Sequence, residues 1–127
     1  MGGMDNDQAI RSLAGIRMAI GTSAWATPRV AGKAFGLDAD ANPQSPYLAR
    51  LFGVRDLALG IGALTTKGDS RRHWLMLGML CDAADAAAGM LAGRAGYLPK
   101  VPTALVTGTA LVAVGLGAAA LANDGAP

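Results

Sequence analysis

Apolar and small residues recur in four long stretches of the chain, separated by short polar segments. The last stretch, from Val101 to Asn123, contains no charged residue. It is longer than the about 20 residues that an α-helix needs to cross a bilayer. The three earlier stretches have the same Ala, Gly and Leu character, but charged residues interrupt them. The pattern predicts an all-α protein with long helices at about 8–26, 46–66, 71–94 and 101–123.

Proline and polar residues mark the predicted helix boundaries. Thr27-Pro28 and Ser45-Pro46 each place an N-cap residue before a proline that suits the first helical position. The first signal predicts a short helix at about 28–36, with an apolar side that would lie on a membrane surface. We therefore expect a single domain, residues 1–127. Its predicted architecture is a four-transmembrane-helix bundle with one short interfacial helix between the first two spanning helices.

The composition favours helices packed in lipid. Hydrophobic residues make up 52% of the chain, whereas aromatic residues make up only 5% and glycine occurs 18 times. Small residues let helix backbones approach closely in a membrane. The net charge of +2 comes without a long basic run, which argues against a nucleic-acid partner. Four aromatic residues near predicted helix ends would anchor the protein at the bilayer interface: Trp25, Tyr47, Trp74 and Tyr97.

Five charged residues lie near the middle of the predicted spanning helices: Arg17, Arg55, Asp56, Asp82 and Asp85. A charge at the bilayer centre costs at least about 2.5 kcal/mol, so such groups are expected to face partners or a polar cavity. Helical periodicity places them on faces rich in small residues, which point toward neighbouring helices rather than lipid. The glycines expected to permit this packing are Gly15, Gly21, Gly53, Gly60, Gly62, Gly78, Gly89 and Gly93.

This charge network allows two interpretations. The arginines could pair with the aspartates only to fix helix register, because an arginine fork matches a carboxylate bidentately. Alternatively, the network is a proton or cation site, or a polar pocket for a small ligand or a lipid head group. Two arginines against three aspartates leave a net charge of −1. Arg50 would balance this charge if it reached inward.

Metal, cofactor and catalytic motifs are not evident. Cys81 is the single cysteine and His73 the single histidine, and neither has a partner at ligand spacing. No residue pattern supplies a nucleophile together with its base. We therefore expect no metal and no cofactor, and the sequence gives more support to a non-enzymatic role than to an enzyme.

Residues 50–60 (RLFGVRDLALG), after an earlier Gly15-x-Arg17 and Pro28, resemble a family of small bacterial four-helix integral membrane proteins. That family is a domain of unknown function and is distantly similar to the DoxX-type four-helix proteins. The resemblance covers most of the chain from Leu13 to Gly93 and is most specific at residues 53–56. It implies a helical membrane fold, and it implies no catalytic or ligand-binding residue.

These observations predict an integral membrane protein, in a bacterial cytoplasmic membrane, that contacts lipids and acts as an accessory or structural subunit or a self-associating scaffold. The small-residue faces exceed what one bundle needs, so we expect a homo-oligomer or a larger membrane complex. An alternative is a small proton- or cation-coupled transporter or carrier that uses the Asp82/Asp85 pair. A weaker alternative is a membrane enzyme acting on a lipid or a quinone.

Overall fold

Five α-helices build the fold in the computed structural model, which describes residues 6–124. They are α1 (Asn6–Ala26), α2 (Pro28–Ala34), α3 (Ser45–Thr65), α4 (Gly68–Arg94) and α5 (Lys100–Asp124). No strand occurs among the described residues, so the predicted all-α class is confirmed. Each helix begins and ends within about three residues of the bounds expected from the sequence.

Proline begins the second and third helices, although the predicted capping hydrogen bonds are not formed. Pro28 and Pro46 lie in the first turns of α2 and α3, where a missing N–H costs nothing. The Thr27 hydroxyl donates backward to the carbonyl oxygen of Ser23, 2.8 Å away, rather than to the helix that follows it. Ser45 is already the first residue of α3. Proline geometry, rather than side-chain capping, therefore marks these two starts.

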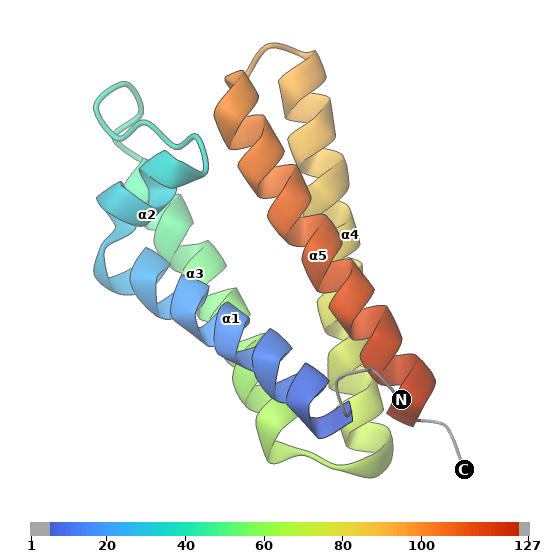
Figure 1. Cartoon of the computed structure of the whole chain (residues 1–127). Coiled ribbons are helices and arrows are strands. Elements are labelled where there is room, and N and C mark those ends of the chain that lie inside the picture. Colours follow the sequence, from blue (N-terminus) through green and yellow to red (C-terminus); the bar gives the residue numbers. More distant parts are fainter. Residues whose placement is uncertain (1–5, 125–127) are drawn as a thin grey trace.

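The helices form two groups that diverge like the arms of a V (Figure 1). α1 packs along α3, with α2 against both, and these three helices are the first half; α4 packs along α5, and these two are the second half. The halves lie close together near the α3–α4 turn and separate toward the other end. There, Gly36 and Gly96 adopt φ angles of +90° and +81°, which glycine reaches without strain as the chain turns after α2 and α4.

Glycine permits close helix contacts within and between the two halves. Gly21 of α1 and Gly53 of α3 face each other, and a Cβ on either would lie 2.5 or 2.6 Å from the other's carbonyl oxygen. Gly15 differs, because no heavy atom lies within 4 Å of the position its Cβ would take. The other expected packing glycines whose added Cβ would meet a neighbouring helix closely are Gly60, Gly62, Gly78, Gly89 and Gly93.

The prediction of four transmembrane helices is wrong. Within residues 6–124, only α4 and α5 are long and apolar enough to cross a membrane. α3 carries Arg50, Arg55 and Asp56 within 21 residues, while α1 carries two arginines and a polar first turn. Those charged and polar groups lower the average hydropathy of α1 and α3 below that of a spanning helix. The error came from giving every long Ala- and Gly-rich helix the same weight, whatever charges interrupted it.

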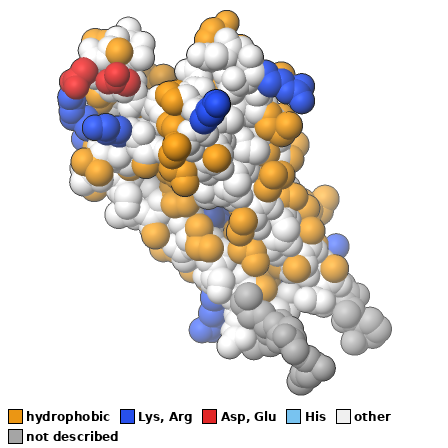
Figure 2. Space-filling view, turned by 45° about the horizontal axis from the view of Figure 1, so that its top comes forward, with side chains coloured by type: hydrophobic (Ala, Val, Ile, Leu, Met, Phe, Trp, Pro, Cys, Tyr) orange, Lys and Arg blue, Asp and Glu red, His pale blue; other side chains and the backbone are white. Residues whose placement is uncertain are grey.

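The described surface is unusually apolar, and the core is built from small residues. Hydrophobic side chains cover much of the visible face of both halves (Figure 2). Nineteen large hydrophobic residues are exposed in the described part of the chain. The buried side chains are mostly alanine, with Ile10, Leu13 and Leu75 supplying the larger apolar contacts.

Candidate functional site

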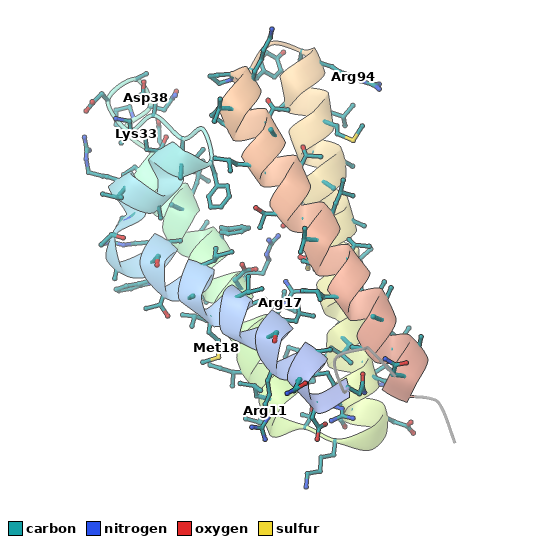
Figure 3. All side chains as sticks on the ribbon, in the orientation of Figure 1. Arg11, Arg17, Met18, Lys33, Asp38 and Arg94 are labelled. Atoms are coloured by element: carbon teal, nitrogen blue, oxygen red, sulfur yellow. The ribbon has the colours of Figure 1, made fainter. Side chains whose placement is uncertain are left out.

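The five charged residues singled out in the sequence meet between the two halves. Arg17 projects from α1 toward the second half (Figure 3). Its two terminal nitrogens donate to the two carboxylate oxygens of Asp82 on α4, at 2.9 and 2.5 Å. Both side chains are only 6% exposed. This bidentate pair is therefore a buried bond between the two halves of the molecule.

A second bidentate pair links α3 to α4. Arg55 donates to both carboxylate oxygens of Asp85, at 3.1 and 2.5 Å. This pair is more accessible than the first, with side-chain exposures of 34% and 26%. The Arg55 guanidinium also lies 4.5 Å from the centre of the Phe52 ring, a favourable cation–π arrangement. Each arginine thus has its own carboxylate partner on α4.

Asp56 is the one carboxylate of the three that has no bidentate arginine partner. It is 5% exposed, and it lies 3.9 Å from Arg17 Nη1 and 3.7 Å from Arg55 Nη2. These separations exceed hydrogen-bonding distance, and Asp56 accepts no hydrogen bond from the described residues. Burial raises the pKa of Asp56 to about 6, although the neighbouring Arg55 and Arg17 guanidinium groups work in the opposite direction. Asp56 is therefore a buried, under-coordinated acceptor.

Arg50 does not balance the network. Its Nε donates to the carbonyl oxygen of Trp25, 2.9 Å away, and its guanidinium lies 5.0 Å from the centre of the Trp25 ring. Arg50 therefore lies at the outer end of the first half, away from the three carboxylates. With two arginines and three aspartates ionised, the network keeps its charge of −1.

Gly78 has a role that the packing argument did not foresee. A Cβ at this position would lie 2.6 Å from Arg17 Nη2. The glycine therefore makes room for the guanidinium beside α4, one helical turn before Asp82. A small residue in α4 thus permits the buried ion pair as well as helix packing.

A cavity of about 490 Å³ lies between the two halves and ends on this charge network. Arg17, Asp56, Asp82 and Asp85 contribute to its wall at one end. Most of the remaining wall is apolar. The lining side chains at its other end include Phe35 and Leu37 from the first half, and Tyr97 and Leu98 from the connection between α4 and α5. The space has the size and mainly apolar lining of small-molecule sites.

A polar pocket at the charge network was one of the interpretations of the sequence, but the long apolar part of the cavity was not predicted. The available signal was the size of its wall residues: Ala88 and Ala92 on α4 meet Ala110 and Ala113 on α5 along the same space. Side chains this small leave room that a leucine-rich face would fill. Small residues were interpreted only as sites of close helix approach, and that interpretation does not separate packing faces from cavity walls.

The four predicted interface anchors are not equivalent. Trp25, Tyr47 and Tyr97 are exposed, at 49%, 65% and 82%. Trp74 is half-buried, and its ring covers Gly62 of α3. The Tyr97 side chain also belongs to the cavity wall. Among the described residues, no group of three or more potential metal-ligating side chains comes together.

No family model, no curated protein and no solved structure matches this chain. The resemblance to small DoxX-like membrane proteins therefore stays a prediction.

Proposed function

We propose that this is a membrane protein whose half-open cavity between the two halves binds a small, largely apolar molecule. The membrane location is supported by α4 and α5, each long and apolar enough to cross a bilayer. The exposed leucines and valines of these two helices, such as Leu80 (67%) and Val112 (61%), would then lie against lipid. A bacterial cytoplasmic membrane and contact with membrane lipids remain part of this proposal.

The observation that carries the binding function is the cavity itself. Its volume is within the range of small-molecule sites. It joins a mainly apolar wall to a few buried polar groups, an arrangement that suits a ligand with an apolar body and one polar end. The polar groups come from α1, α3 and α4, so a ligand at that end would contact both halves of the molecule.

A matched pair of variants tests this function. Ala88 lines the cavity and is exposed, whereas its neighbour Ala87 is exposed but does not line it. We expect Ala88→Phe to fill part of the cavity and to lower the binding of decanol, while Ala87→Phe leaves binding unchanged. Binding is measured by native mass spectrometry of detergent-released protein titrated with decanol. Equal binding by the parent and both variants would show that the cavity is not the binding site.

A second candidate function is a structural or self-associating membrane subunit. It is favoured by the two bidentate pairs, which join the halves and need no ligand to do so. The size-exclusion mass of the purified protein in detergent tests it, because a self-associating subunit elutes as an oligomer. A protein that is monomeric over a wide range of detergent-to-protein ratios would count against this candidate.

The alternative of a proton- or cation-coupled transporter has less support at the Asp82/Asp85 pair, where its site was expected. A cation held between Asp82 and Asp85 would compete with Arg17 and Arg55 for the same oxygens. Asp56, by contrast, accepts no hydrogen bond from the described residues, so its oxygens can still accept one. Any binding of a positive group in this network is therefore better placed at Asp56 than at the Asp82/Asp85 pair.

A further inference from the structure

The chemistry of the buried end of the cavity narrows the class of ligand, provided the proposed binding function holds. Arg17 and Arg55 each use two nitrogens on one aspartate, which matches each positive charge with a negative charge. Asp56 lies beside both arginines without a hydrogen bond to either, and its side chain is 6% exposed. Asp56 is one of the residues that line the cavity.

Asp56 keeps ion pairs with Arg17 and Arg55 at 3.9 and 3.7 Å, but it accepts no hydrogen bond from the described residues. Burial has therefore removed most of its water without supplying a direct donor in exchange, and this is costly. A ligand that brings N–H donors and a positive charge to Asp56 would remove this cost. A bare Ca²⁺ or Mg²⁺ ion is a poor fit, because these ions take six or more oxygen ligands. Asp56 is a single carboxylate, and no group of three potential metal-ligating side chains occurs in residues 6–124.

The apolar wall defines the rest of the ligand. Along α4, the lining extends from Asp82 to Ala92, which corresponds to about 15 Å at the rise of an α-helix. Small side chains line the cavity between these two positions, and Val106 and Ala110 of α5 contribute to the same wall. The space suits an unbranched hydrocarbon chain better than a hydrated ion or a sugar.

We infer that the cavity selects amphiphiles with a protonated primary amine at the head and a hydrocarbon tail, and that Asp56 is the counterion of the amine. The ammonium group lies at the charged end of the cavity and donates to Asp56. The tail extends along α4 and α5 toward Phe35 and Leu98.

The test compares three compounds with the same decyl chain: decylamine, decanol and decanoic acid. Each is titrated into the detergent-solubilised protein at pH 7.5, and the bound fraction is read by native mass spectrometry. We expect decylamine to bind at least about tenfold more tightly than decanol, because either head group can donate to Asp56 but only the ammonium also brings a positive charge to it. Decanoic acid should bind most weakly, because its carboxylate faces Asp56.

Two variants locate the preference. Asp56→Asn keeps the size of the side chain and removes its charge, so the advantage of decylamine over decanol should disappear while decanol still binds. Asp69→Asn, at an exposed position in the first turn of α4, should leave the preference unchanged. If Asp56→Asn does not fold, the comparison among the three compounds on the parent protein still decides the inference.

The possible outcomes separate this inference from the proposed function. Equal binding of decylamine and decanol would overturn the amine preference and leave the cavity as an apolar binding site. Tighter binding of decanoic acid would overturn it as well and would assign the head group to the arginines. Failure of all three compounds to bind the parent more tightly than the Ala88→Phe variant would remove the binding function itself.

Discussion

The two halves of this protein solve the packing of similar, small-residue-rich helices in different ways. In the first half, α1 and α3 approach through backbone contact at Gly21 and Gly53, and both helices carry charges. In the second half, α4 meets α5 through Gly89 and Gly93, against threonine side chains, and the helices are apolar enough to span a bilayer. Two arginines of the first half, Arg17 and Arg55, pair with two aspartates on α4 of the second half.

This difference shows what the ion pairs do. α4 has the hydropathy of a spanning helix even though Asp82 and Asp85 lie near its middle. Those carboxylates are tolerable there because arginines from α1 and α3 bind them. The arginines of the first half therefore neutralise the aspartates of the second half. Separating the two halves should lower the stability of the protein.

The largest expected effect comes from breaking the buried pair. Arg17→Met leaves Asp82 as an uncompensated buried charge, and we expect a loss of about 3–5 kcal/mol in the free energy of unfolding. Thermal unfolding of the detergent-solubilised protein measures it. The double variant Arg17→Met/Asp82→Leu should recover most of this loss, because it removes both charges from the interior.

The more accessible pair is the control for this effect. Arg55 and Asp85 have side-chain exposures of 34% and 26%, so water can partly solvate a carboxylate left alone. Arg55→Met should therefore cost less than Arg17→Met. An equal or larger loss for Arg55→Met would contradict the difference in burial between the two pairs.

A slightly smaller effect is expected from a charge on the outer surface of the second half. Leu80 is 67% exposed near the middle of α4, and a lysine there should cost about 2.5–3.5 kcal/mol of insertion free energy. We expect Leu80→Lys to lower the carbonate-resistant membrane fraction of the protein. Val30→Lys, at a 74% exposed position on α2 outside both candidate spans, should leave that fraction unchanged. Equal fractions for all three proteins would argue against insertion of α4.

Two glycines of α1 provide a sharper comparison within one helix. Gly21→Ala places a methyl group 2.5 Å from the Gly53 carbonyl oxygen, so the helices must separate, at a cost of about 1–3 kcal/mol. Gly15→Ala meets no atom within 4 Å and should stabilise the protein by up to about 1 kcal/mol, because alanine favours helix over glycine. Unfolding midpoints in one detergent should therefore shift in opposite directions. Shifts of the same sign would show that α1 and α3 do not cross as described.

The sequence predicted the helices well and the membrane topology poorly, for physical reasons. Helix bounds follow from local signals such as Pro28 and Pro46, which act within one turn. Whether a helix crosses a membrane depends on its total hydropathy, and the charges at Arg50, Arg55 and Asp56 shift that balance in α3. Local pattern therefore identified the helices without deciding how many of them could span.

The site shows the same division between local and tertiary information. Periodicity pointed the five charges inward, and the structure brings them together. The choice of partners could not be read from spacing, because Arg17 pairs with a residue 65 positions away. The alternative transport hypothesis assigned its site to the Asp82/Asp85 pair, whereas the carboxylate without a hydrogen-bond donor is Asp56. Which of three acids lacks a donor depends on the reach of two arginine side chains, and this is settled only by the fold.

The last expected effect is a dependence of stability on pH that belongs to Asp56. Its pKa is raised from 3.8 to about 6 in the folded protein, with burial as the main cause. The folded state then binds more protons than the unfolded state between about pH 4 and pH 6, so stability should fall as the pH rises through this interval. Arg17, Arg55, Asp82 and Asp85 face Asp56 from the three packed helices and set the size of the effect.

Asp56→Asn should flatten this part of the pH profile, because asparagine does not titrate. The measurement is the unfolding midpoint in detergent at intervals from pH 4 to pH 7, with Asp69→Asn as the control for removal of an exposed carboxylate. The parent and Asp69→Asn should lose stability over that range more steeply than Asp56→Asn. Parallel profiles for all three proteins would mean that Asp56 is ionised with little penalty in the fold.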